Sequence, residues 1–144
     1  MLQDAAQVCY RDEFQSYRCA SSHHPLFFCG NSLDVLRDLP AASLDVCMTS
    51  PPYWGQRQYS SVGIGEEADF RDYVRDLSAI CREAKRVLKD SGSFWLNIGD
   101  TYQEKRLLGI PWRVALELTD KQGWLLRNDV IWNKVKGGPD NAKD

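Results

Sequence analysis

Two adjacent prolines, Pro51 and Pro52, directly after the apolar run at 44–48, limit the fold of this chain more than any other feature. Each proline fixes its own φ near about −65° and lacks an N–H donor, so an apolar strand must end here. The carbonyl groups of the turn are then left without partners in a sheet ladder. The sequence therefore predicts a buried strand at 44–48, followed by a rigid turn that is rich in hydrogen-bond acceptors.

The side chains of this turn suit a planar group that carries an amine. Ser50 adds a hydroxyl acceptor beside the carbonyls, and Tyr53 and Trp54 add flat apolar faces. The same residues would also make an ordinary proline turn with two core aromatics. The turn alone does not separate these two interpretations.

Length and composition predict one soluble domain. The chain has 144 residues, of which 43% are hydrophobic, enough for a core. Its net charge of −2 gives no overall attraction to nucleic acid, so contacts with DNA must come from local patches or from another polypeptide. Because no apolar run reaches the roughly 20 residues of a membrane span, and the first residues lack a signal-peptide core, we expect a cytoplasmic protein.

The five cysteines are odd in number and include no C-x-x-C pair. We therefore expect reduced and mostly buried thiols that form no disulfide and no metal site. They are Cys9, Cys19, Cys29, Cys47 and Cys81.

Apolar runs and amphipathic stretches alternate along the chain. Strands are predicted at 26–29, 44–48, 93–98 and 124–134, and helices over Leu33–Leu39, 69–89 and 110–121. This order predicts an α/β fold with a mostly parallel sheet and helices packed on its faces. Residues 1–25 are expected to form an amino-terminal arm, and residues 26–144 the domain itself.

Six blocks of sequence together resemble DNA amino-methyltransferases. They are Gly30–Leu33, Leu44–Trp54, Gly63–Glu66, Trp95–Asp100, Gly109–Arg113 and Asp129–Lys134. More narrowly, the chain is similar to the permuted (β) group, which methylates cytosine N4 or adenine N6 with S-adenosylmethionine. The resemblance implies part of a Rossmann-like methyltransferase sheet and double-stranded DNA as the substrate.

For the catalytic residues Ser50, Pro51, Pro52 and Tyr53, the resemblance implies a mechanism. The target base would leave the duplex, and the Ser50 oxygen and Pro51 carbonyl would accept the two N–H groups of its exocyclic amine. Tyr53 would stack on the base, and the localised nitrogen lone pair would attack the methyl of the sulfonium. In this family, a serine at the first turn position favours cytosine N4, while adenine N6 stays open as an alternative.

Other residues are assigned to the cofactor and to DNA. Asn31, Ser50 and Asn97 are expected to bind the cofactor, although a turn or capping role would suit Asn31 equally well, and capping is the simpler role for Asn97 and Asp100. The residues expected to contact the substrate are Trp54, Arg57 and Lys134. The remaining tryptophans are expected to pack in the core, at positions 95, 112, 124 and 132.

In complete enzymes of this group, a target-recognition region and an F-x-G-x-G cofactor loop follow these blocks, and neither is found in this sequence. We therefore expect the amino-terminal catalytic portion of a methyltransferase, truncated or split, which a second polypeptide would complete. The alternative is a non-catalytic remnant that acts as an interaction module.

Overall fold

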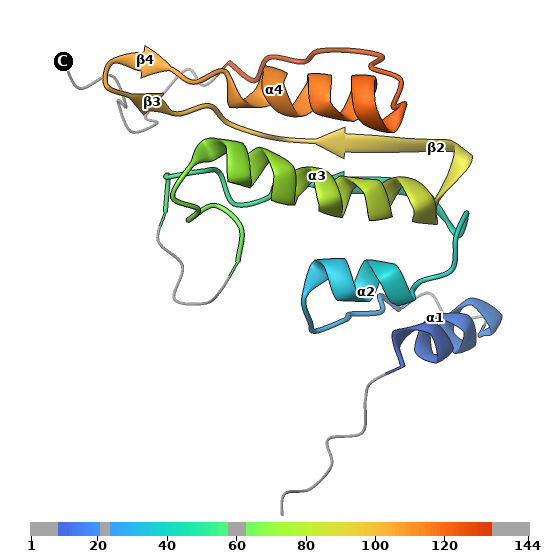
Figure 1. Cartoon of the computed structure of the whole chain (residues 1–144). Helices are drawn as coiled ribbons and strands as arrows, with labels where there is room; N and C mark the ends of the chain where they lie inside the picture. Colours follow the sequence, from blue (N-terminus) through green and yellow to red (C-terminus); the bar gives the residue numbers. More distant parts are fainter. Residues whose placement is uncertain (1–8, 21–23, 58–62, 134–144) are drawn as a thin grey trace, which may run out of the picture. The chain divides into compact units, whose positions relative to one another are not determined.

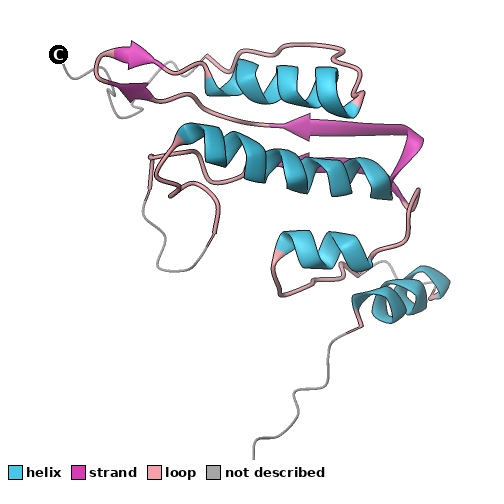
Figure 2. Cartoon of the chain, in the orientation of Figure 1, coloured by secondary structure: helices cyan, strands magenta, loops and turns pink. Residues whose placement is uncertain are grey.

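The computed structural model describes residues 9–20, 24–57 and 63–133. It divides into two compact units. The first unit is Met1–Cys47 with Glu83–Ser93, and the second is Met48–Arg82 with Phe94–Asp144. Figure 1 follows the elements in chain order, and Figure 2 marks helices, strands and loops.

The first unit is built on two short helices, α1 (Tyr10–Cys19) and α2 (Ser32–Asp38). The side chain of Asn31 begins α2, since its oxygen accepts a hydrogen bond from the Leu33 N–H at 2.9 Å. At the other end of α2, the guanidinium of Arg86 donates to the carbonyls of Leu36 and Leu39. The helix is thus held at both ends by polar contacts. Its small core consists of Phe14, Leu39 and Val87, with Phe28, Leu36 and Leu44 packed against them.

A strand, a long helix and a second strand follow α2 along the chain (Figure 1). They are β1 (Leu44–Thr49), α3 (Phe70–Val87) and β2 (Leu88–Leu96), and the two strands pair in a parallel sheet. The predicted strand at 44–48 and the predicted long helix are confirmed. Asp69 caps α3, because its carboxylate accepts a hydrogen bond from the Arg71 N–H at 2.7 Å. The helix ends two residues early because the chain from Leu88 onward is already in β2.

The core of the second unit lies between α3 and α4 (Ile110–Leu116). Pro111 stands in the first turn of α4, where its missing N–H costs nothing. The helix continues as a π-helical turn, η1 (Glu117–Lys121), and ends before Gly123, which has a φ of 66°. These bounds confirm the predicted helix at 110–121. The buried core residues are Phe70, Tyr73, Val74, Leu77, Cys81, Ile110, Val114 and Leu118.

A small antiparallel hairpin lies in the loop between β2 and α4. It pairs β3 (Tyr102–Gln103) with β4 (Arg106–Leu107). The two residues at its tip, Glu104 and Lys105, have φ values of 50° and 63°, as a tight hairpin turn requires. The sequence predicted neither a strand nor a helix over these residues.

Two predicted strands are wrong over the residues that the structure describes. Neither 26–29 nor 124–133 is a strand, and residue 134 lies outside the described residues. Phe28 and Trp124 pack against the cores of their units, but other side chains in both segments are open to solvent, with Phe27 82% and Ile131 84% exposed. A strand needs a neighbour to pair with, and no described strand pairs with either segment. The described fold is therefore mixed α/β, with four helices, one parallel pair of strands and one small antiparallel pair.

The expected burial of cysteines and tryptophans also needs correction. None of the five cysteines, all of them among the described residues, forms a disulfide, but only Cys81 is buried, while Cys9, Cys19 and Cys29 are exposed. Three of the four tryptophans expected in the core are exposed, and only Trp124 packs against it; the exposed ones are Trp95, Trp112 and Trp132. The reason is clearest on β2, where alternate side chains face opposite sides and Phe94 and Leu96 already face the core.

The region expected to be an arm contains helix α1, whose Phe14 is buried. Over the described residues, no helix is both long and apolar enough to cross a membrane.

Candidate active site

The carboxyl ends of β1 and β2 meet within the second unit. The carbonyl of Thr49, the last residue of β1, accepts a hydrogen bond from the Asn97 N–H at 2.9 Å. This backbone contact brings the next side chains together, and the Asn97 amide nitrogen lies 3.5 Å from the Ser50 hydroxyl oxygen. Both residues are exposed. The structure thus brings together two of the residues predicted from the sequence, at the sheet edge where α/β folds bind ligands.

Tyr53 joins this pair from the far side of the turn. Its hydroxyl lies 3.3 Å from the Ser50 hydroxyl, and either group can donate. A phenol and an amide are thereby gathered within hydrogen-bond reach of one hydroxyl, that of Ser50. Each of them can both donate and accept, so the set can serve a ligand that carries either kind of group.

The ring of Tyr53 lies directly against Gly99. A Cβ atom at position 99 would lie 2.8 Å from Cδ2 and 2.9 Å from Cε2 of this ring, closer than such atoms can approach. Only glycine allows the ring to lie there. The sequence analysis gave Gly99 no role, although a glycine directly after a predicted strand is a sign of close backbone approach.

The carbonyl groups of the turn fall into two sets. Those of Pro52 and Trp54 accept hydrogen bonds from the Tyr73 hydroxyl at 2.9 Å and the Thr101 hydroxyl at 2.8 Å. Among the residues that the structure describes, those of Ser50 and Pro51 have no partner. We call Ser50 and Pro51 the open half of the turn, and residues 52–56 the held half.

Tyr73 lies in the predicted helix at 69–89, and its side chain reaches the turn. It is fully buried, and its hydroxyl is the donor to the Pro52 carbonyl. Burial raises the pKa of this hydroxyl above its usual range, and the nearby Glu67 carboxylate adds to the rise. Tyr73 therefore stays protonated and remains a donor near neutral pH.

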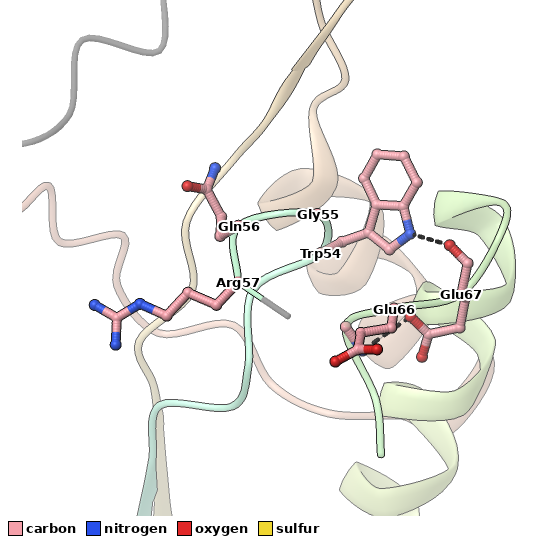
Figure 3. A pocket seen from close by; sticks show the side chains of 7 residues that line it. Trp54, Gly55, Gln56, Arg57, Glu66 and Glu67 are labelled. Atoms are coloured by element: carbon pink, nitrogen blue, oxygen red, sulfur yellow. Dashed lines mark hydrogen bonds between the residues drawn. The ribbon is translucent and has the colours of Figure 1, made fainter. Parts of the chain in front are cut away.

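Trp54 is fixed by its indole group. The indole N–H donates to the Glu67 carbonyl at 2.8 Å, a contact visible in Figure 3, and the ring packs edge to face on Phe70 at 6.2 Å between centroids. Its remaining surface borders an open depression of about 320 Å³. The depression is lined by Trp54, Gly55, Gln56, Arg57, Gly65, Glu66 and Glu67.

The loop at 63–67 forms the other wall of this depression. The Glu67 carboxylate accepts a hydrogen bond from the Gly65 N–H at 2.9 Å, and the Gly65 carbonyl accepts one from the Gly55 N–H at 3.0 Å. Gly65 has a φ of 106°, which favours glycine. In Figure 3 the Arg57 side chain extends away from Glu66 and Glu67, so the depression presents cationic and acidic groups in different directions.

Asp100 has a structural role. Its carboxylate accepts hydrogen bonds from the N–H groups of Thr101 at 2.8 Å, Gly109 at 2.9 Å and Ile110 at 3.0 Å, which caps α4 and closes the hairpin loop. This is the capping role that the sequence favoured for it. The loop after β2 also stabilises the turn after β1, because the amide of Gln56 donates to the Thr101 hydroxyl at 3.0 Å.

The two remaining predicted site residues are Asn31 and Lys134. Asn31 belongs to the first unit, where its side chain caps α2. Lys134 lies outside the described residues. Within the described ranges, no three His, Cys, Asp or Glu side chains are arranged to hold a metal ion.

Comparison with known proteins gives a consistent result. The N6/N4 DNA methylase family model matches residues 44–144. The type II methyltransferase M.XycI of Xanthomonas campestris pv. cyanopsidis is 40% identical over 147 residues, a match that covers 81% of this chain and 49% of that protein. M.SmaI of Serratia marcescens is 36% identical, with 80% of this chain and 49% of that protein covered.

A third relative, the type II methyltransferase M.SfiI of Streptomyces fimbriatus, is 38% identical over 153 residues, which cover 92% of this chain and 36% of that protein. The chain thus spans about half the length, or less, of these curated relatives. The family model covers most of the chain and includes the turn, both strand ends and the α4 cap. On this evidence, the chain belongs to the N6/N4 DNA methylase family.

Proposed function

We propose that this chain carries the amine-binding, catalytic portion of a site-specific DNA methyltransferase that methylates cytosine N4, with S-adenosylmethionine as the methyl donor. The observation that carries the proposal is the division of the turn. Ser50 and Pro51 offer a hydroxyl and a carbonyl without a backbone partner among the described residues, while the residues after them are held in place. A site that binds an amine needs unpaired hydrogen-bond acceptors on a backbone whose conformation is fixed.

The exocyclic amine of a base is a weak nucleophile because its lone pair is delocalised into the ring. In the proposed site, the base leaves the DNA duplex and its amine enters the open half of the turn. The Ser50 hydroxyl accepts one N–H and the Pro51 carbonyl accepts the other, which draws the nitrogen toward tetrahedral geometry. Tyr53, fixed against Gly99, stacks on the ring of the base. Both effects work by positioning and by electrostatic support for the charge that develops on the nitrogen.

S-adenosylmethionine supplies an electrophilic methyl group on a sulfonium. The described residues fit part of this cofactor, since the Asn97 amide and Ser50 hydroxyl stand exposed at adjacent strand ends and can bind its polar groups. We propose that β1 and β2 belong to the Rossmann-like sheet that the family implies. The remaining cofactor contacts, including a glycine loop, would come from a complementing polypeptide, and Arg57 and Lys134 would contact DNA phosphates.

The choice of cytosine rests on Ser50. A neutral hydroxyl stands at the first turn position, and in the family that the chain resembles this residue accompanies cytosine N4. Adenine N6 is the second candidate, because its amine has the same two N–H groups.

A methylation assay tests the proposal. The chain would be incubated with labelled S-adenosylmethionine and double-stranded DNA, alone and with the part of M.XycI that lies outside the match, and the DNA would then be digested to nucleosides for mass spectrometry. We expect N4-methylcytosine in the mixture, and its loss in Ser50→Ala. The matched control is Ser91→Ala, at an exposed serine of β2, which should leave the yield unchanged.

Each alternative predicts a different result. N6-methyladenine in place of N4-methylcytosine would overturn the choice of base. No methyl transfer in any mixture would overturn the enzymatic proposal and favour an interaction module.

A further inference from the structure

We propose that Tyr73 is a positioning residue: by donating to the Pro52 carbonyl, it orients the neighbouring Pro51 carbonyl toward the amine of the target base. This inference rests on the proposed function, because it names the residue that sets the geometry of that site. Nothing in the turn sequence points to Tyr73, which comes from α3, 21 residues farther along the chain.

Tyr73 is a donor whose position is fixed. Its side chain is fully buried in the core of the second unit, and its hydroxyl lies 2.9 Å from the Pro52 carbonyl oxygen. It stands one turn inside α3, whose start is fixed by the Asp69 cap. Because burial holds the pKa of the hydroxyl high, the donor does not ionise near neutral pH.

The hydrogen bond to the Pro52 carbonyl also restricts the orientation of the Pro51 carbonyl. The peptide planes that carry these two carbonyls are joined only by φ and ψ of residue 52. The proline ring fixes φ at that position, so ψ of Pro52 is the one soft angle between the anchored plane and the Pro51 carbonyl. On the other side, each proline restricts ψ of the residue before it to extended values. Holding the Pro52 carbonyl therefore limits the directions in which the Pro51 carbonyl can point.

This hydrogen bond makes two neighbouring acceptors different: the Pro52 carbonyl has Tyr73 as its donor, while the Pro51 carbonyl has no partner among the described residues. Without Tyr73, the Pro52 carbonyl would be a partly buried acceptor without its donor, and the turn would gain by rotating it toward water. Because the chain is held before Ser50 by β1 and after Pro52 by the contacts of Trp54 and Gly55, a rotation about ψ of Pro52 must be compensated by ψ of Pro51, which moves the Pro51 carbonyl relative to Ser50. The two acceptors of the open half would then no longer fit the two N–H groups of a single amine.

Tyr73→Phe tests the proposal, because it keeps the ring and removes only the hydroxyl. The first readout does not depend on activity: the chain is labelled with ¹³C at proline carbonyls, and the signals of Pro51 and Pro52 are compared by NMR. We expect both signals to shift in Tyr73→Phe. A shift at Pro52 with Pro51 unchanged would overturn the proposal, since the Pro51 carbonyl would then keep its orientation without the hydrogen bond.

The second readout is steady-state kinetics in the mixture with the M.XycI part. Loss of one positioning hydrogen bond should lower kcat about tenfold and leave KM for DNA within about twofold, because the misplaced acceptor weakens the transition state more than binding. An unchanged kcat would contradict the proposal. So would a loss of activity that appears only at temperatures where the variant unfolds, which would indicate a structural role.

Ser78→Ala is the matched control on the same helix. Ser78 is also buried, but its hydroxyl has no hydrogen-bond partner among the described residues, so its removal should change neither the proline signals nor kcat. If the unaltered protein transfers no methyl group in any mixture, the proposed function fails. The carbonyl signals still decide whether Tyr73 orients the turn, so the two failures are distinguishable.

Discussion

The held half of the turn after β1 takes its hydrogen bonds from three other segments: α3, the loop at 63–67 and the loop after β2. The open half, one residue away, has an exposed hydroxyl, and its two carbonyls have no partner among the described residues. The difference shows that the residues that make the turn rigid are not the residues whose acceptors are available to a ligand. An acceptor that must bind a ligand cannot also form a hydrogen bond that stabilises the fold, so the neighbouring residues hold the backbone in place.

Gly99→Val should break the held half most severely. The new side chain would overlap the Tyr53 ring, and forcing the two apart should lower the free energy of unfolding by about 3 kcal/mol. Urea denaturation measures the loss. The same substitution in a Tyr53→Ala background should cost much less, because the ring is gone. Equal costs in both backgrounds would show that the ring does not lie against Gly99.

Asp100→Ala should have the next largest effect. It removes three hydrogen bonds that close the loop behind the held half and cap α4, and we expect a loss of about 2 kcal/mol in the free energy of unfolding. Asp100→Asn keeps one acceptor oxygen and should lose about half as much. If Asn proves as harmful as Ala in urea titrations, the carboxylate does not act through these acceptor contacts.

Thr101→Val tests a single link to the held half. Valine keeps the shape but loses the donor to the Trp54 carbonyl and the acceptor for Gln56, so unfolding should become easier by about 1 kcal/mol. Thr119→Val is the control, since that hydroxyl contacts only its own helical segment. Calorimetric melting of both variants should separate them, and indistinguishable midpoints would argue against the link.

Asp69 gives a smaller effect that depends on pH. The Arg71 N–H is the main reason why the pKa of this carboxyl lies below its ordinary value, with the Arg71 side chain as a further cause. A lowered pKa in the folded state means that the ionised form stabilises the protein above the unfolded value of about 4, and that this contribution is lost as the pH falls. Asp69→Asn should flatten the melting profile below that pH, whereas Asp90→Asn, at an exposed site in β2, should change it less.

Ser50→Ala should have the smallest effect on stability and sharpens the comparison. Ser50 is exposed, so the free energy of unfolding should change by less than about 0.5 kcal/mol. Methyl transfer in the complemented mixture should nevertheless fall about 100-fold, because an acceptor that acts in the transition state is lost. A variant that loses stability and activity in parallel would mean that the open half is part of the frame.

The elements that the sequence predicted well depend on local patterns. The apolar spacing of α3 and the proline stop after β1 act within a few residues, and both appear within two residues of their predicted bounds. The apolar runs at 26–29 and 124–133 have similar composition, but a strand also needs a partner, which composition does not encode. Both segments are irregular in the described structure.

The site divides in the same way. The approach of Ser50, Tyr53 and Asn97 was predictable, because the carboxyl ends of parallel strands share one sheet edge. The roles of Tyr73 and Thr101 were not, because each contacts the turn from a segment 21 or 47 residues away. In the sequence, Tyr73 is an aromatic residue in a helix and Thr101 is a polar residue in a loop. Many residues with no part in a site have the same description, so neither could be singled out.

The distribution of thiols gives this protein a built-in chemical reporter. Its three exposed cysteines, Cys9, Cys19 and Cys29, all belong to the first unit, while Cys81 of the second unit is 1% exposed. A maleimide dye would therefore attach far more readily at the first three positions and leave the turn chemically untouched. The rate at which Cys81 is modified, measured by mass spectrometry, would then report how often the core around Tyr73 opens. No residue has to be engineered for this measurement.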